Sequence, residues 1–126
     1  MAEYHNVTPR NWVPSSIPGS AELVDNGTSN PNKVNKFSDD MWAVLDGAGN
    51  LLLKKHADYG PTNISRSPGG PLNGLRVRMW DKTARINHLI DSGATPENES
   101  LRDSFIDLLN YSAIALMVLD GNWPND

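Results

Sequence analysis

Apolar and polar residues follow no regular period over residues 1–36, and a helical period begins only after them. This first stretch is rich in Pro, Asn, Ser and Gly, and it lacks the spacing of about 3.6 or 2 residues that marks a helix or a strand. It therefore predicts an irregular N-terminal arm, followed by a helical domain over residues 37–126. Disorder of the arm and its attachment through Trp12, Val13 and Ile17 are both open at this point.

The first helix is predicted within FSDDMWAVLDGAGNLLLKKHADYG, residues 37–60. Ser38 is a favourable N-cap residue with acidic residues after it. One helical face carries the apolar residues Met41, Val44, Leu45, Ala48 and Leu52. Gly47 and Gly49 weaken the prediction, and the Asp-Gly pair permits a hairpin instead. The continuous apolar face favours the helix, which Gly60 and the proline after it would end.

Two further helices are predicted after a loop rich in Pro and Gly, residues 61–74. The second is LRVRMWDKTARINHLIDSG, with Gly93 just past its end. The third is TPENESLRDSFIDLLNYSAIALMVLDG, with Thr95 as N-cap, Pro96 at the first helical position and Gly121 at its end. Three helices predict an all-α fold, a small helical bundle with an irregular N-terminal arm.

The third helix is apolar nearly all round after Asn110, which is typical of a central, buried helix. Its core face is predicted to consist of Leu101, Phe105, Leu108, Leu109, Leu116 and Leu119. A row of polar residues, Glu99, Asp103, Asp107 and Asn110, follows the same helix and would run partly inside the bundle. Buried carboxylates need partners, because an unpaired one is costly or takes up a proton.

Two kinds of partner are possible for this acidic row. The second helix carries a charged stripe of Arg78, Asp81, Lys82 and Arg85, which would form ion pairs with it or would simply face solvent. Alternatively, Asp103 and Asp107 would hold a divalent cation together with Glu99, and oxygen ligands suit Mg²⁺ or Mn²⁺.

Composition excludes several classes of protein. The net charge of −4 argues against nonspecific nucleic-acid binding, and the absence of cysteine excludes disulfides and thiolate metal sites. No apolar run reaches the roughly 18 residues of a membrane span, and no signal peptide is recognised. We therefore expect a cytoplasmic protein without a membrane partner. We also expect a homodimer or higher homo-oligomer, because three helices are a small unit to cover a core.

Three segments together resemble the nucleotide modification associated domain 1 family, which occurs in phages and bacteria. They are KKHADYGPTNI, GPLNGLRVRMWDKTARINHLI and NESLRDSFIDLLNYSAIAL, and the resemblance covers roughly residues 50–119. It implies a nucleotide-binding protein of (deoxy)nucleotide metabolism, located in the host cytoplasm if it is encoded by a phage.

The last helix also resembles, more faintly, the all-α MazG-like nucleotide pyrophosphohydrolases, which hold Mg²⁺ with a Glu-X-X-Glu and a Glu-X-X-Asp motif. Asp107 matches the aspartate, but Ser104 stands at the glutamate position beside Asp103, and the first helix has no Glu-X-X-Glu. The resemblance implies a metal-dependent phosphohydrolase or pyrophosphohydrolase. The retained acidic row with its facing cations favours the hydrolase, whereas the missing glutamates favour a noncatalytic nucleotide-binding or interaction module. A structural domain with paired charges is the third possibility.

These residues predict one pocket at the end of the first helix. Asp103, Asp107 and His56 are the candidate catalytic residues, and the candidate metal ligands are Glu99, Asp103 and Asp107. His56 is also readily explained as a solvated helix-end residue. Basic side chains would bind phosphate, Tyr59 or Trp80 would stack on a base, and asparagines would read base or sugar edges. The candidate ligand-binding residues are Lys55, Asp58, Tyr59, Asn63, Arg78, Asp81, Lys82, Arg85 and Asn110.

Overall fold

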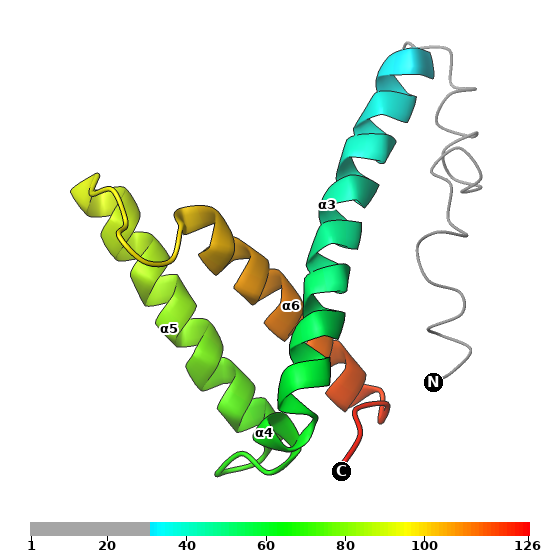
Figure 1. Cartoon of the computed structure of the whole chain (residues 1–126), viewed down its shortest axis with the longest axis vertical. Helices are drawn as coiled ribbons and strands as arrows, with labels where there is room; N and C mark the ends of the chain where they lie inside the picture. The colour runs from blue at the N-terminus through cyan, green and yellow to red at the C-terminus, as the bar shows by residue number, and fades with distance from the viewer. Residues whose placement is uncertain (1–30) are drawn as a thin grey trace. The chain divides into compact units, whose positions relative to one another are not determined.

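The computed structural model describes residues 31–126, and over this range the chain is α-helical with no strand (Figure 1). Its helices are α3 (Pro31–Tyr59), α4 (Thr62–Ser65), α5 (Pro71–Ser92) and α6 (Leu101–Leu119). The predicted all-α class is therefore confirmed. Residues 1–30, which form most of the predicted arm, lie outside the described range.

Two compact units divide the chain, one ending at Asn50 and the other comprising Leu51–Asp126. The described part of the first unit is the beginning of α3. That helix starts at Pro31, so Ser38 is not its N-cap, and residues 31–36 are helical rather than irregular. Proline is well tolerated in a first helical turn, and no strong helix breaker follows it before Gly47. The helix continues through both internal glycines, which excludes the hairpin alternative.

The second unit begins with the last turns of α3 and the short helix α4. Gly60 ends α3 with a left-handed backbone (φ 68°), and its amide donates to the His56 carbonyl at 2.8 Å. The following residues were predicted to be a loop, but Thr62–Ser65 form a helical turn. This turn places Ile64 in the core, where it is almost fully buried.

Helix α5 begins at Pro71, earlier than predicted, because proline is favourable at the first helical position. It ends at Gly93, which has the expected left-handed backbone. Near its start, α5 lies so close to the preceding loop that a Cβ atom on Gly74 would collide with Ser67 and lie 2.9 Å from Arg78 Nη1. Only glycine permits this approach.

Helix α6 begins after Ser100 and not after Thr95, as the sequence had suggested. Ser100 and Asp103 form a capping box, in which the Asp103 amide donates to Ser100 Oγ at 3.0 Å and the Ser100 amide donates to Asp103 Oδ2 at 3.2 Å. The residues before Ser100 are therefore not helical. Glu99 in particular precedes the helix, so it is not one turn away from Asp103 on a common helical face.

The core of the second unit is small and centres on Ile64, Leu75 and Ile114. Partly buried apolar residues pack around these three: Leu52, Tyr111, Ala115, Val118 and Trp123. The C-terminal segment belongs to this packing, because Trp123 Nε1 donates to the Pro61 carbonyl at 3.1 Å. Arg66 also forms an exposed ion pair with Asp126 at 2.8 Å.

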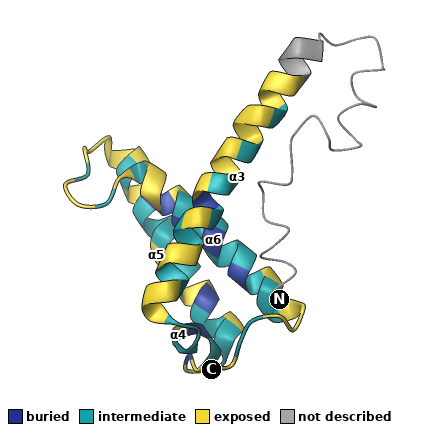
Figure 2. Ribbon diagram, turned by 45° about the vertical axis from the view of Figure 1, so that its right-hand side comes forward, coloured by how far each residue is buried: buried dark blue, intermediate teal, exposed yellow. Residues whose placement is uncertain are grey.

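The predicted core face of α6 is wrong for three of its six residues, while Leu101, Leu108 and Leu109 are partly buried. Phe105, Leu116 and Leu119 are 50%, 61% and 66% exposed. The buried positions of α6 are instead Ser104, Asp107, Asn110 and Ile114. Figure 2 shows how few positions are buried and how much of the helical surface is exposed.

Helix α5 follows its sequence pattern more closely. Leu75 and Ile86 share one face of α5 at helical spacing and are buried, although Ile90 near the end of the helix is exposed. Val77 and Trp80 lie on the opposite side and are exposed. Among the described helices, none is both long and apolar enough to cross a membrane.

Candidate functional site

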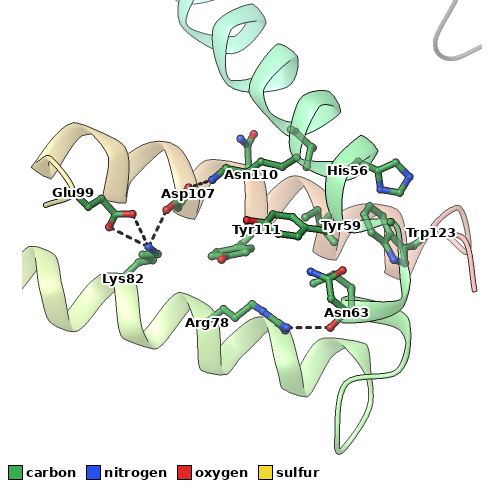
Figure 3. Close-up of a pocket in the computed structure, with 15 residues that line it drawn as sticks. His56, Tyr59, Asn63, Arg78, Lys82, Glu99, Asp107, Asn110, Tyr111 and Trp123 are labelled. Carbon is green, nitrogen blue, oxygen red and sulfur yellow. Dashed lines mark hydrogen bonds and ion pairs between the residues drawn. The ribbon is translucent and has the colours of Figure 1, made fainter.

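One cavity of about 320 Å³ lies within the second unit. The last two turns of α3, the α4 segment, α5, α6 and the C-terminal segment all contribute to its wall (Figure 3). The charged residues of its lining are Lys55, Arg78, Lys82, Glu99 and Asp107. The remaining lining residues are Leu52, His56, Tyr59, Gly60, Asn63, Ile64, Asn110, Tyr111, Ile114 and Trp123.

Lys82 of α5 is at the centre of the charged end of the cavity. Its ammonium group lies 2.9 and 3.0 Å from the two carboxylate oxygens of Glu99 and 2.9 Å from Asp107 Oδ2. Three carboxylate oxygens thus surround one cation. Burial alone would lower the pKa of Lys82, but the hydrogen bonds to Glu99 and Asp107 and the negative charges of these residues outweigh it and raise the pKa.

Asp107 joins α6 to both neighbouring helices. Lys82 binds its Oδ2 atom from α5, while Lys55 Nζ from α3 binds its Oδ1 atom at 3.0 Å. The Asp107 side chain is only 10% exposed. Burial would raise the pKa of Asp107, but the hydrogen bonds and charges of Lys82 and Lys55 keep this pKa below its ordinary value. Asp107 is therefore the ionised partner of both lysines.

A second layer of contacts holds Glu99 in place. Ser104, which is fully buried, donates from Oγ to Glu99 Oε2 at 3.0 Å and accepts from Arg85 Nη1 at 3.0 Å. Arg85 also donates to the Glu99 carbonyl and lies 3.7 Å from Glu99 Oε2. These contacts hold Glu99, which precedes α6 and lies outside any helix, against α5.

Arg78 forms another part of the wall and connects α5 with the α4 segment. Its Nη2 donates to the Asn63 carbonyl at 3.0 Å and its Nη1 to Ser67 Oγ at 3.3 Å. Ser67 Oγ in turn donates to the Asn63 carbonyl at 2.8 Å. These bonds place the guanidinium group beside the Asn63 side chain at the cavity (Figure 3).

The other end of the cavity is aromatic. The His56 and Trp123 rings meet edge to face with centroids 5.2 Å apart, and Tyr59 and Tyr111 also line the cavity. Figure 3 shows His56 and Trp123 on the side away from Lys82 and Glu99. The Nδ1 atom of His56 is buried and has no hydrogen-bond partner among residues 31–126. The cavity thus combines a charged end with an aromatic end.

The structure brings together most of the residues predicted for the site. Besides Glu99 and Asp107, the cavity is lined by the candidates Lys55, His56, Tyr59, Asn63, Arg78, Lys82 and Asn110. Asp58 and Asp81 are exposed and do not line it. Arg85 acts behind Glu99 rather than at the surface of the cavity. Trp80, a predicted stacking residue, is exposed on the far side of α5.

The predicted metal set is not assembled as the sequence suggested. Asp103 is exposed and caps α6, whereas Glu99 and Asp107 share Lys82. Across the described chain, no group of three or more His, Asp or Glu residues is arranged to hold a metal ion. Metal binding by Glu99, Asp103 and Asp107 together therefore stays a prediction without a preformed cluster.

The sequence did not place two aromatic residues of the wall, Tyr111 and Trp123, at the site. Tyr111 lies one helical turn after Asp107, so the helical period could have placed it beside that carboxylate. Trp123 follows the end of α6 in a short polar segment, where no local pattern indicates which surface it contacts. Its position results from tertiary packing on the α4 segment.

Comparison with known proteins adds one finding. A family model described as nucleotide modification associated domain 1 matches residues 55–119. The match contains every residue that lines the cavity except Leu52 and Trp123. No curated protein and no solved structure matches the chain. The fainter resemblance to MazG-like enzymes is not shown by any match and stays a hypothesis.

Proposed function

We propose that this chain, which belongs to the nucleotide modification associated domain 1 family, binds a nucleotide in the cavity of its second unit. The observation that carries the proposal is the composition of the wall. Lys55, Arg78 and Lys82 from two helices line one cavity that also has an aromatic end. A nucleotide combines an anionic phosphate with a flat base, and such a cavity suits both parts.

The charged end suits a phosphate group for two reasons. The whole cavity is lined by three basic residues and two acidic ones, so it favours one added anion. Lys82 already uses its three N–H groups on carboxylate oxygens. Lys55 has one such partner among the described residues, Asp107, and its side chain is 45% exposed. Lys55 and Arg78 would therefore make the first contacts with phosphate oxygens, and Lys82 would follow by exchanging a carboxylate for the ligand.

The aromatic end suits the base and sugar. Tyr59 and Trp123 offer faces or edges for stacking, and Tyr111 offers another between the two ends of the cavity. His56 presents a ring whose Nδ1 has no partner in the described chain, and Asn63 and Asn110 line the same cavity. A volume of about 320 Å³ lies in the range of small-ligand sites.

Metal-dependent hydrolysis is a second candidate, favoured by the convergence of Glu99 and Asp107 on one cation. Their oxygens surround the Lys82 ammonium at 2.9–3.0 Å, so the pair is suited to a positive charge. Mg²⁺ typically uses one or two carboxylates together with substrate phosphates. Glu99 and Asp107 would hold Mg²⁺ or Mn²⁺ in exchange for Lys82, and the ion would polarise a phosphoryl group or activate a water. Without turnover, the protein is a noncatalytic nucleotide-binding module.

Binding is tested by isothermal titration calorimetry with a panel of deoxy- and ribonucleotides carrying one to three phosphates. We expect at least one nucleotide to bind, and we expect Lys55→Ala to weaken it about tenfold, since a charged hydrogen bond is lost. Lys54→Ala is the matched control, because Lys54 is the neighbouring lysine, is exposed and does not line the cavity. Absence of binding across the panel, or equal affinities of the two variants, would contradict the proposal.

Turnover is tested separately by mass spectrometry of the same panel with Mg²⁺ or Mn²⁺ present. Loss of one nucleotide with the wild type but not with Asp107→Asn would establish the hydrolase. Binding without turnover would leave the noncatalytic function. The two experiments together distinguish a binding site from an active site.

A further inference from the structure

One side of α6 has a regular arrangement that the cavity does not use. Its residues, called the α6 outer strip, are the exposed Phe105, Leu116 and Leu119 and the partly buried Leu108 and Ser112. At about 100° per residue they fall within roughly 80° of one another on the helix. The sequence separations are 3, 4, 4 and 3, so the strip is symmetric about Ser112. This is the period of helices that pack against each other along a seam.

Two charged residues flank the strip on the same side of α6. Arg102 lies in the first turn and Asp120 is the C-cap residue, and both are exposed. Neither side chain forms an ion pair or hydrogen bond within residues 31–126. Their placement also opposes the helix dipole, which favours acidic residues at the N-terminus and basic residues at the C-terminus. The isolated helix therefore gives no reason for either charge.

We propose that two copies of this chain associate through the α6 outer strip, with the two α6 helices antiparallel and a twofold axis near Ser112. In this arrangement Phe105 packs against Leu119 of the partner subunit, and Leu108 packs against Leu116 of the partner subunit. The small Ser112 lies at the crossing point, where two helices approach most closely. Such an interface is isologous, because each pair of contacts occurs twice.

Charge complementarity supports a second copy as the partner. Antiparallel pairing brings Arg102 to the end of the other α6, close to Asp120 of the partner subunit. Each charge that is unfavourable in its own helix then meets an opposite charge. A symmetric strip with opposite charges at its two ends is complementary to itself, whereas an unrelated partner would not require the symmetry.

The proposed interface and the cavity lie on opposite sides of α6. Asp107 and Asn110 project from the buried side, about half a turn away from the outer strip. Association therefore leaves each cavity accessible, and a dimer has two independent cavities. A monomeric chain could still bind a nucleotide, and a chain that binds no nucleotide could still form the dimer.

Sedimentation velocity of the full chain across protein concentrations up to about 100 µM tests the association, since specific interfaces of modest size form in this range. We expect a concentration-dependent dimer. Leu116→Gln should weaken it at least about a hundredfold, because two buried leucines are lost at once. Val77→Gln replaces an exposed apolar residue of α5 and should leave the dimer unchanged. A monomer at the highest concentration, or equal behaviour of the two variants, would overturn the proposal.

A charge swap tests the antiparallel orientation. Arg102→Glu and Asp120→Arg should each weaken the dimer by roughly tenfold, because each places like charges together at two symmetric positions. The double variant should restore association to nearly the wild-type level. Each reversal agrees with the helix dipole, so weaker association would not result from unfolding of α6, which circular dichroism verifies. A double variant as weak as the single ones would overturn the antiparallel pairing.

Discussion

The two sides of α6 differ in the opposite way from an ordinary amphipathic helix. Besides Ile114, the inner side buries the polar residues Ser104, Asp107 and Asn110, whereas the outer side exposes Phe105 and Leu116. A surface helix usually buries its apolar residues and exposes its polar ones. The difference shows that neighbouring groups, rather than the hydropathy of α6 alone, decided which side became the inner one.

The neighbours that make this burial possible are cations on the adjoining helices. Lys82 and Lys55 bind Asp107, and Arg85 binds Ser104. A carboxylate removed from water without partners would cost several kcal/mol or become protonated. With two lysines in place, Asp107 remains charged and buried. The polar residues of the inner side are therefore stable when buried only while their basic partners are present. Substitutions on the inner side should destabilise the protein more than substitutions on the outer side.

The largest effect is expected for Asp107→Ala. This change leaves Lys55 without its carboxylate and Lys82 with Glu99 alone, so we expect the free energy of unfolding to fall by about 2–3 kcal/mol. Urea denaturation followed by circular dichroism gives this quantity. Asp58→Ala is the control, because Asp58 is an exposed aspartate outside the cavity and should change stability by less than about 0.5 kcal/mol. Similar losses in free energy of unfolding for both variants would contradict a stabilising role of the Asp107 ion pairs.

A smaller effect is expected from a matched pair of serines on α6. Ser104→Ala removes the hydroxyl that links Glu99 and Arg85, and it should destabilise the protein by about 1–2 kcal/mol. Ser112→Ala makes the same change on the outer side and should be neutral or gain a few tenths of a kcal/mol from helix propensity. Thermal unfolding of both variants measures the difference. Equal losses would show that the two sides do not differ energetically.

The smallest effect is expected from pH. The folded pKa of Asp107 lies below its ordinary value of 3.8, so below 3.8 the unfolded chain binds the proton more readily. The stabilisation that ionised Asp107 contributes is complete above about pH 3.8, and it disappears as the pH falls through the pKa of Asp107 in the folded protein. The stability difference between the wild type and Asp107→Asn should therefore shrink below about pH 3.8, as urea denaturation between about pH 3 and 6 would show. A difference independent of pH would contradict the charged pairing.

Much of the fold was predictable from local sequence signals. The existence and order of the three long helices, the end of α3 at Gly60 and the end of α5 at Gly93 followed from periodicity and glycine positions. The true start of α6 also has a sequence signal, since Ser100 and Asp103 have the spacing of a capping box while Thr95 lacks an acidic residue three positions later. The capping box of Ser100 and Asp103 therefore determines the start of α6, although Pro96 would also be favourable at a first helical position.

The inversion of α6 could not be predicted in the same way. Its six leucine and phenylalanine positions gave the stronger core pattern, and nothing in the helix itself indicates that Lys55 and Lys82 will meet Asp107. Of the charged candidates, Lys55, Lys82 and Asp107 line the cavity and bind one another across three helices. Asp58 and Asp81 have similar chemistry, but they face solvent and do not line it.

The ammonium group of Lys82 has a consequence for spectroscopy. Its three protons are held by carboxylate oxygens of Glu99 and Asp107, and its side chain is largely shielded from water. Protons held in this way exchange with solvent more slowly than those of exposed lysines. The Lys82 side-chain resonance should thus be distinct from those of surface lysines such as Lys54. Any molecule that enters the charged end of the cavity would change this one signal directly, without a label and without substitution.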